Sequence, residues 1–301
     1  MPPLSSRAAV ARDLSAADLP DVAREFDFSD SDFRGLAQLA YERAGIALAD
    51  SKRNLVYTRL SRRLRVLGFP SFRQYRDYLD GPDGEQEMER FINSISTNHT
   101  KFFREGHHFD HFRTHVAAPF AQTSRGSTGC RLRVWSAGCS TGEEPHTIAV
   151  VLKREIRDIE RQDVRILATD IDTDVLAKAA RGEYQMSSID DIPKTYQSYF
   201  EPVDGGDDES TTVAVNEDVR SLIAFRRLNL MESWPFRGLF DAIFCRNVMI
   251  YFDAPTRAAL VERFTQQLKP GCWLYIGHSE SLIGSHPGLE LVGRTVYRRI
   301  A

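Results

Sequence analysis

The chain has 301 residues, a formal net charge of −3 and a hydrophobic fraction of 42%, which fits ordinary globular packing over two domains. This charge excludes a strong global attraction to nucleic acid or to an anionic membrane. No stretch of about 18 apolar residues predicts a membrane span, and residues 1–10 lack the apolar core of a signal peptide. The four cysteines form no CxxC pair and show no metal-ligand spacing, so we expect free thiols and a cytoplasmic protein.

A small all-helical domain is predicted for residues 27–95, after a loose tail at 1–26. Apolar residues recur at helical spacing, and capping residues, glycine or proline mark the helix ends. The helices are expected between Ser29 and Gly45 and at about 51–67, 72–79 and 84–95. Residues 96–128 then supply a connecting helix, at about 105–120, and a linker.

From residue 129 to 301 the pattern changes to short apolar strands that alternate with helices. Strands are expected at 132–136, 164–170, 240–245 and 272–276, and helices at 144–156, 173–180 and 255–268. This alternation implies right-handed crossovers and an α/β fold with a mostly parallel sheet. Between about 183 and 222, a strand-like stretch at 211–215 and an acidic glycine-rich turn at 204–208 predict a small antiparallel insertion.

A glycine loop follows the first predicted strand and opens the next helix. Gly138 and Gly142 allow the backbone to approach a ligand closely. Glu143 and Glu144 would repel a pyrophosphate and favour a cationic amine or sulfonium. Asp170 ends the next strand, where an acidic residue binds ribose hydroxyls in nucleotide-binding folds. The loop therefore predicts a nucleoside ligand without phosphates, a description that fits S-adenosylmethionine.

The same loop also spells G-x-S-x-G around Ser140, which is the nucleophile elbow of α/β-hydrolases. Asp253 and His278 follow in the order that such a triad requires. Against a hydrolase, no HGGG-type segment lies upstream, and only one strand of the predicted sheet precedes the loop. A hydrolase is the weaker hypothesis, and a glycine turn that binds nothing is a third.

Six strings occur in a fixed order along the chain: 94–105 (SISTNHTKFFRE), 140–145 (STGEEP), 168–172 (ATDID), 244–252 (FCRNVMIYF), 269–271 (KPG) and 277–280 (GHSE). Together they resemble the CheR family, the chemotaxis-receptor glutamate methyltransferases, over roughly residues 28–299. The resemblance implies a Rossmann-like methyltransferase sheet. It also implies an S-adenosylmethionine-dependent protein-glutamate O-methyltransferase that releases S-adenosylhomocysteine.

The resemblance assigns roles to individual residues. The implied cofactor-binding positions are Asn98, Thr100, Arg104, Gly138, Glu144, Asp170, Asn229, Leu230, Arg246 and Asn247. Glu144 would hold the amino group of the methionine portion, and Asp170 the ribose hydroxyls. Arg104 and Tyr251 are the candidate catalytic residues, which would position the acceptor. No general base is expected, because a glutamate carboxylate is already ionised at neutral pH.

Cations are concentrated on the predicted helix at 51–67, opposite or beside an apolar stripe. The candidate substrate-binding residues are Arg53, Arg59, Arg62, Arg63 and Arg65. A merely solvated face is the ordinary interpretation, whereas the resemblance implies contact with the glutamate-rich helical cytoplasmic region of a chemoreceptor. The acidic overall charge and the lack of interleaved aromatics argue against nucleic acid.

The insertion at about 183–222 is similar to the β-subdomain of this family, which in some members pairs with a peptide at the receptor C-terminus. Gly205 and Gly206 lie where a loop governs that ability. We expect a monomer that is not inserted into a membrane. A catalytically silent S-adenosylmethionine-sensing or receptor-docking module of the same fold is the main alternative to an enzyme.

Four histidines lie close together on the predicted connecting helix, at positions 107, 108, 111 and 115. No carboxylate or cysteine partner occurs at a known metal-ligand spacing. We therefore predict partly exposed helix residues and no metal.

Overall fold

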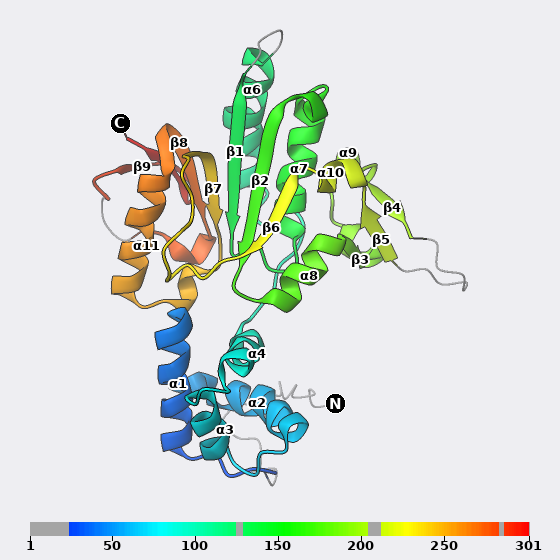
Figure 1. Cartoon of the computed structure of the whole chain (residues 1–301). Coiled ribbons are helices and arrows are strands. Elements are labelled where there is room, and N and C mark those ends of the chain that lie inside the picture. Colours follow the sequence, from blue (N-terminus) through cyan, green and yellow to red (C-terminus); the bar gives the residue numbers. More distant parts are fainter. Residues whose placement is uncertain (1–23, 125–128, 204–211, 283–285, 301) are drawn as a thin grey trace, which may run out of the picture.

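The computed structural model describes residues 24–124, 129–203, 212–282 and 286–300. Most of the predicted tail, part of the predicted linker and the glycine-rich turn with Gly205 and Gly206 lie outside these ranges. The described chain forms a helical unit followed by an α/β unit with a small additional sheet (Figure 1). Within those ranges, none of the helices combines the length and the hydropathy that a membrane-crossing segment needs.

The helical unit contains α1 (Asp30–Ala44), α2 (Arg53–Leu67), α3 (Phe72–Leu79) and α4 (Glu85–Ile95), which confirms the four predicted helices. Capping explains the ends of α1: Ser29 and Asp32 form a capping box, and Gly45 ends the helix in the left-handed conformation. A short 3₁₀ turn (Asp50–Lys52) precedes α2. Apolar side chains of all four helices form one buried cluster, separate from the core of the α/β unit.

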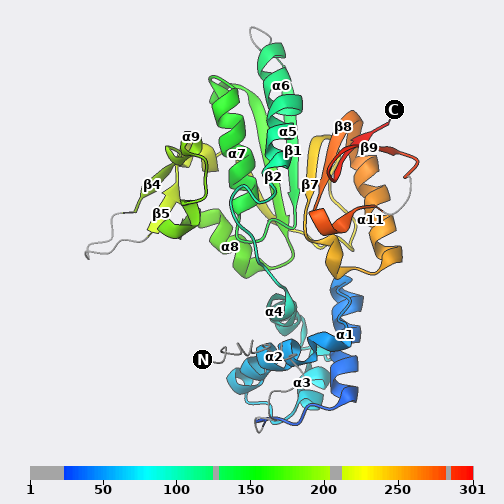
Figure 2. The same ribbon diagram turned by 180° about the vertical axis from the view of Figure 1, so that it is seen from behind.

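The predicted connecting helix is three segments in sequence, α5 (His107–Phe112), a π-helical turn (Arg113–Ala117) and α6 (Ala118–Thr123). Figure 2 shows this rod beside α7 (Glu143–Glu155), on the face of the main sheet that α11 (Ala254–Gln267) does not cover. Its buried aromatic residues Phe109 and Phe112 pack on Phe244 of the sheet. The rod therefore belongs to the α/β unit.

The main sheet has seven strands in the order β6-β2-β1-β7-β8-β10-β9. Their bounds are β1 (Arg131–Ala137), β2 (Asp163–Asp170), β6 (Ile223–Arg227), β7 (Phe240–Cys245), β8 (Leu268–Ile276), β9 (Leu289–Gly293) and β10 (Val296–Arg299). All neighbouring pairs are parallel except those that β10 makes with β8 and β9. The strand order reverses between β1 and β7, and in open α/β sheets ligands bind at the carboxyl ends of the strands at such a point. The predicted α/β fold and mostly parallel sheet are confirmed.

The predicted antiparallel insertion is also confirmed. It holds β3 (Glu183–Gln185), β5 (Thr212–Val215) and β4 (Phe200–Pro202), in that order, with α9 (Lys194–Gln197) and α10 (Glu217–Arg220). It leaves the main fold after α8 (Thr173–Arg181) and returns to it at β6. Figure 1 shows the small sheet at the outer side of α7 and α8.

Hydrogen bonds join the helical unit to the carboxyl end of the main sheet, below which it lies in Figure 1. The backbone N–H of Ala47 donates to the carbonyl of Tyr251 at 2.8 Å. The Tyr41 hydroxyl donates to the Asp253 carboxylate at 2.9 Å. Arg90 on α4 pairs with Asp174 at the start of α8, again at 2.9 Å. The two units therefore meet where the strand order predicts a ligand site.

Candidate active site

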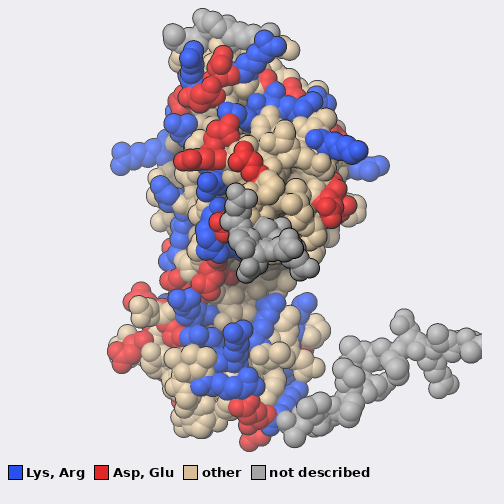
Figure 3. Space-filling model, turned by 90° about the vertical axis from the view of Figure 1, so that its right-hand side faces the viewer, with Lys and Arg blue, Asp and Glu red and all other residues tan. Residues whose placement is uncertain are grey.

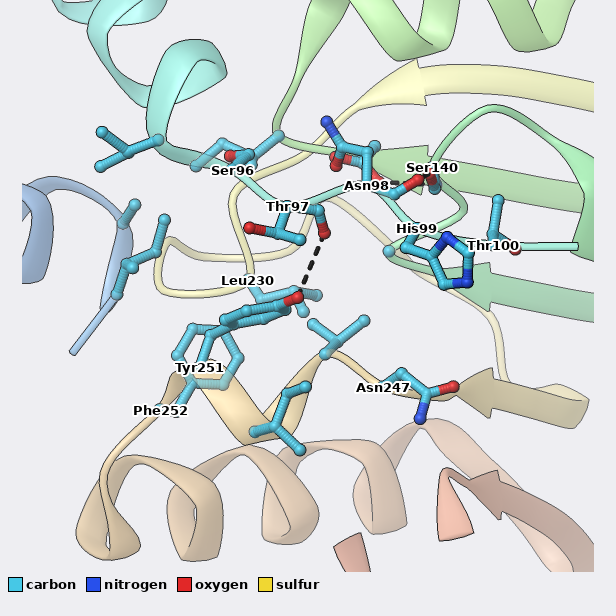
Figure 4. Close-up of a pocket in the computed structure, with 18 of the residues that line it drawn as sticks. Ser96, Thr97, Asn98, His99, Thr100, Ser140, Leu230, Asn247, Tyr251 and Phe252 are labelled. Atoms are coloured by element: carbon cyan, nitrogen blue, oxygen red, sulfur yellow. Dashed lines mark hydrogen bonds between the residues drawn. The ribbon is translucent and has the colours of Figure 1, made fainter. Parts of the chain in front are cut away.

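A cavity of about 440 Å³ opens between the helical unit and the carboxyl ends of β1, β2 and β7. Its walls come from residues 44–55, 95–104, 138–144, 170–171, 228–230 and 246–252. All the predicted cofactor-binding and catalytic residues line it: Asn98, Thr100, Arg104, Gly138, Glu144, Asp170, Asn229, Leu230, Arg246, Asn247 and Tyr251. Figure 4 shows the cavity between the segment that carries Asn98 and the turn that carries Tyr251. The fold thus gathers residues that are distant in the sequence into one site.

The two loop glycines serve different purposes. Both have left-handed backbones, with φ of +79° at Gly138 and +97° at Gly142. A Cβ on Gly138 would lie 2.3 Å from Val248 Cγ2, inside the cavity wall. A Cβ on Gly142 would lie 2.7 Å from Ala179 Cβ on α8. Gly142 does not line the cavity, so our expectation that it admits a ligand is wrong, and it provides space for α8 instead.

Ser140 does not belong to a hydrolase triad. Its hydroxyl donates to the carbonyl of Asn98 at 2.9 Å. Asp253 caps α11 by accepting the N–H of Thr256 at 2.9 Å. His278 lies in a 3₁₀ turn after β8, where its N–H donates to Glu105 at 3.1 Å. The hydroxyl of Ser140 and the carboxylate of Asp253 thus have separate partners, and no hydrogen bond among the described residues joins either of them to His278, so the geometry argues against the hydrolase hypothesis.

Asp170 lies at the end of β2 with both carboxylate oxygens already accepting backbone N–H groups. Oδ2 accepts from Ser140 at 2.8 Å, and Oδ1 accepts from Asp172 at 3.0 Å. Burial raises its pKa to about 6, although these hydrogen bonds lower it. Each carboxylate oxygen has a second lone pair, so the side chain keeps the capacity to accept hydroxyl groups. The hydrogen bonds that Asp170 accepts from the backbone therefore still allow it to accept the ribose hydroxyls, as predicted.

Asp172, which the sequence analysis did not single out, orders the neighbouring segment. Its Oδ1 caps α8 through the N–H groups of Asp174 and Val175. Its Oδ2 accepts from the Asn98 side chain at 2.7 Å. The Asn98 amide therefore holds residues 95–104 against the end of β2.

Glu143 and Glu144 do not act as a pair. Glu143 accepts from the Thr141 hydroxyl at 2.6 Å and does not line the cavity. Glu144 lines the cavity and accepts from Ser136 at 2.7 Å and from Arg246 at 3.1 Å. Burial raises the pKa of Glu144, and the neighbouring Arg246 guanidinium opposes this shift. Of the two carboxylates predicted to repel a phosphate, only that of Glu144 therefore faces the cavity.

Arg246 is the centre of a buried charge cluster. Its side chain is 2% exposed and lies between Glu144 and Glu105, which is 3.4 Å away. It also donates to the main-chain carbonyl of Arg104. Two carboxylates thus surround one guanidinium, and the remaining negative charge suits a cationic ligand. Glu105 was missed by the sequence analysis because only the fold brings it to Arg246.

Arg104 and Tyr251 lie at the more exposed side of the cavity, beside Thr97 and His99. Arg104 donates to the carbonyl of His99 at 2.9 Å. The Tyr251 hydroxyl donates to the carbonyl of Thr97 at 3.1 Å, across the cavity (Figure 4). Burial raises the pKa of Tyr251, and the nearby Arg104 charge lowers it. Both side chains therefore border the same cavity, and the hydrogen bonds to His99 and Thr97 place them along the segment 97–104.

Asn229 and Leu230 complete the wall next to the helical unit. Asn229 donates to the carbonyl of Arg43 at 2.7 Å and accepts the N–H of Met231 at 3.0 Å. Leu230 and Phe252 present apolar surface to the cavity, which suits a planar base. Asn247, the second residue after β7, has a left-handed backbone with φ of 59°.

The predicted substrate-binding arginines are in different environments. Arg62 and Arg65 are exposed on α2, and Arg65 reaches Glu25 at 2.6 Å. Arg59 donates to the carbonyls of Ile95 and Ser96 at the end of α4. Arg53 pairs with Asp30, and Arg63 forms a largely buried pair with Glu87 at 2.5 Å. Figure 3 shows Lys and Arg side chains gathered over the helical unit.

The histidines of the connecting rod are not uniformly exposed. His108 is fully buried and donates to the carbonyl of Arg294 at 3.1 Å, so the prediction of partial exposure is wrong there. Burial lowers its pKa to about 3. His111 is hydrogen-bonded to the Tyr275 hydroxyl at 3.0 Å. These contacts give the two rings structural roles.

Comparison with known proteins assigns both units. The model described as CheR methyltransferase, all-alpha domain, matches residues 31–96, and the model described as CheR methyltransferase, SAM binding domain, matches residues 98–298. Chemotaxis protein methyltransferase 2 of Pseudomonas aeruginosa is 42% identical over 275 residues, which are 91% of this chain and 95% of that protein. The chemotaxis protein methyltransferase of Salmonella typhimurium is 41% identical over 281 residues, 93% of each chain. The chain belongs to the CheR methyltransferase family and is an S-adenosylmethionine-dependent methyltransferase.

Proposed function

We propose that this methyltransferase transfers methyl groups to glutamate side chains in the cytoplasmic helical region of chemoreceptors, giving glutamyl methyl esters for sensory adaptation. The observation that carries the proposal is that Arg104 and Tyr251 line one cavity, hydrogen-bonded to the exposed residues His99 and Thr97, next to a buried charge cluster with two carboxylates and one guanidinium. The Arg104 guanidinium suits an anionic acceptor. The Tyr251 phenol, which donates a hydrogen bond to the Thr97 carbonyl, bounds the space beside it. The chemotaxis names of the relatives support the receptor as substrate.

The residues present fit S-adenosylmethionine. Asp170 offers a carboxylate to ribose hydroxyls, Leu230 and Phe252 offer an apolar wall to adenine, and the cluster around Arg246 has an unbalanced negative charge. When bound, this cofactor would supply a methyl group carried on a positively charged sulfur, which an oxygen of the acceptor carboxylate would receive. Because a glutamate acceptor is already ionised at neutral pH, such a transfer would need no general base from this chain.

The residues of this chain therefore have to orient and desolvate the acceptor rather than ionise it. Arg104 would hold one carboxylate oxygen, and Tyr251 would limit where the second oxygen lies. The cavity walls from the helical unit would exclude water from the reacting oxygen. Positioning of this kind accounts for about 7–11 kcal/mol of barrier lowering in well-oriented reactions.

The experiment that tests the function follows labelled methyl from S-adenosylmethionine into receptor-bearing membranes. Base-labile release of the label as methanol, mapped to glutamate residues of the receptor, is expected. Receptor binding without transfer would contradict the proposal and would favour a docking module. Label in base-stable adducts would point to another acceptor group.

Receptor docking is proposed to use the exposed cations of α2. Replacing Arg62 and Arg65 together by glutamate is expected to raise KM for the receptor about 10-fold at low salt, because like charges would face an acidic bundle. The dissociation constant of S-adenosylhomocysteine should not change. Arg34 and Arg237, which are also exposed but lie outside α2, provide the matched double control. An equal rise in KM for that control would show that only the net charge matters.

We also propose that a peptide can pair with the small sheet as an additional strand. β3 and β4 are its edge strands, since each pairs only with β5 among the described residues. Extended peptides bind exposed sheets by adding a strand at an edge. A receptor C-terminal peptide is the occupant that we expect.

Cofactor affinity is expected to fall as the solution is acidified through pH 6. The folded-state pKa of Asp170 is raised from 3.8 to about 6, so the carboxylate that accepts ribose hydroxyls is largely protonated at pH 5. The same shift means that this group favours folding at low pH and loses that contribution as pH rises through about 6. Affinity for S-adenosylhomocysteine should thus drop about tenfold between pH 7 and 5.

Calorimetric titration across this range checks the expectation. Asp170→Asn should bind more weakly at pH 7 and lose most of the pH dependence. An unchanged pH profile in this variant would assign the titration to another group.

A further inference from the structure

Glu280 lies outside the cavity, yet its carboxylate organises the turn that forms one cavity wall. The side chain is 4% exposed and belongs to the 3₁₀ turn (His278–Glu280) after β8. Oε2 accepts the N–H groups of Asn247 at 2.6 Å and Gly277 at 2.7 Å. Oε1 accepts the N–H of Ile250 at 3.0 Å. One buried carboxylate therefore satisfies three backbone donors that no regular ladder pairs.

The turn held in this way presents side chains to the cavity. Residues 247–252 line it, with the exception of Met249, which is buried in the core behind it. The turn begins with the left-handed Asn247 and continues as a 3₁₀ turn (Met249–Tyr251). Such a short irregular segment makes few backbone hydrogen bonds of its own. Its conformation therefore depends on contacts from outside, and Glu280 supplies two of them.

The close packing of Glu280 against the turn requires a residue without a Cβ at position 277. A Cβ at that position would lie 2.5 Å from Glu280 Oε2 and 2.7 Å from the backbone nitrogen of Asn247. The close approach of the two segments thus requires glycine, although its φ of −66° is open to any residue. The carboxylate and the glycine together fix the distance between β8 and the turn.

At its far end the turn carries Tyr251, whose hydroxyl and carbonyl are both engaged. The hydroxyl donates to Thr97, and the carbonyl accepts from Ala47 of the helical unit. Both contacts require the backbone at Ile250 and Tyr251 to stay in place. We propose that Glu280 is a positioning residue for methyl transfer, which acts through the turn to hold Tyr251 against the acceptor. This inference rests on the role proposed for Tyr251.

Glu280→Gln is the informative substitution because it keeps the shape and changes one contact. The remaining side-chain oxygen can accept from Asn247 and Gly277, but the new amide NH₂ then faces the N–H of Ile250, and two donors cannot bond. The Ile250 N–H is released, one residue before Tyr251. Glu290→Gln on exposed β9 is the matched control.

The main experiment is a double-mutant cycle with Tyr251→Phe. Glu280→Gln alone is expected to lower kcat by about 10- to 100-fold, with KM for the receptor changed by less than about threefold. In the Tyr251→Phe background the same substitution should lower kcat by less than about threefold, because the Tyr251 hydroxyl that Glu280 is proposed to position is already absent. Glu290→Gln should leave kcat unchanged in both backgrounds. Equal losses from Glu280→Gln in both backgrounds would overturn the proposal.

Amide hydrogen exchange provides a test that needs neither the variant nor turnover. In the unsubstituted protein, the amides of Asn247 and Ile250 should be protected, because the Glu280 carboxylate rather than a helix or strand carbonyl accepts them. Unprotected exchange at both would overturn the proposal. If these amides are protected but Tyr251→Phe retains full turnover, the role proposed for Tyr251 fails and Glu280 is confined to fixing the turn.

Discussion

Replacing Arg104 by alanine is expected to lower the turnover number by about 100-fold or more, while the dissociation constant of S-adenosylhomocysteine stays within about threefold. The physical reason is that Arg104 lines the cavity beside the exposed His99, on the side where we propose that the acceptor enters. The main chain of Arg104 is held separately by Arg246, so the substitution should leave the loop in place.

Rate measurements with receptor membranes, combined with calorimetric titration of S-adenosylhomocysteine, distinguish the possible roles. Arg104→Lys keeps the charge but cannot bind a carboxylate in a bidentate manner. Its turnover number should therefore lie between those of Arg104→Ala and the unsubstituted protein. Equal losses in turnover and in product affinity would instead make Arg104 a cofactor-binding residue, the other role that the family resemblance implies. Thermal unfolding should be nearly unchanged.

Replacing Arg246 by alanine is expected to lower the free energy of unfolding by about 3–5 kcal/mol. The substitution would leave Glu144 and Glu105 buried without their shared cation, and would free the carbonyl of Arg104. Loss of the cation stacked near Phe109 adds to the packing defect. Cofactor binding should also be lost at temperatures where the protein stays folded.

Urea titration followed by circular dichroism measures this effect. The exposed Arg237→Ala is the matched control and should change stability by less than about 0.5 kcal/mol. Adding Glu144→Gln to Arg246→Ala should recover part of the loss, since one bare carboxylate is removed. A loss below about 1 kcal/mol in the single variant would show that the two carboxylates are neutralised in another way.

Much of the fold was predictable because local signals coincide with the real ends of elements. Ser29 and Gly45 enclose α1, and the glycine and proline positions around α2 and α3 mark their ends. β6 was missed because its residues are half-buried or exposed and show no alternation. β9 and β10 are short antiparallel strands at one edge, where pairing with β8 rather than local pattern decides the structure.

The site was predictable as a set of residues but not as a set of contacts. The family resemblance named the residues that line the cavity. The local interpretation of the glycine loop, however, paired Glu144 with Glu143, whereas its partner in the structure is Arg246. Charge balance around Arg246 depends on Glu105, which reaches it only after the connecting rod has packed on the sheet. The contacts of Glu280 with the turn likewise join segments whose proximity is a property of the tertiary fold.

The shared wall of the cavity has a consequence for how such proteins can evolve. Residues 44–55 of the helical unit close the same space that residues 246–252 of the α/β unit form. A recombination event that joined the helical unit of one relative to the α/β unit of another would replace one side of the cavity wall in a single step. We expect chimeras of that kind to lose activity even when both halves fold, and substitutions on the two sides of the wall to be accepted in compensating pairs.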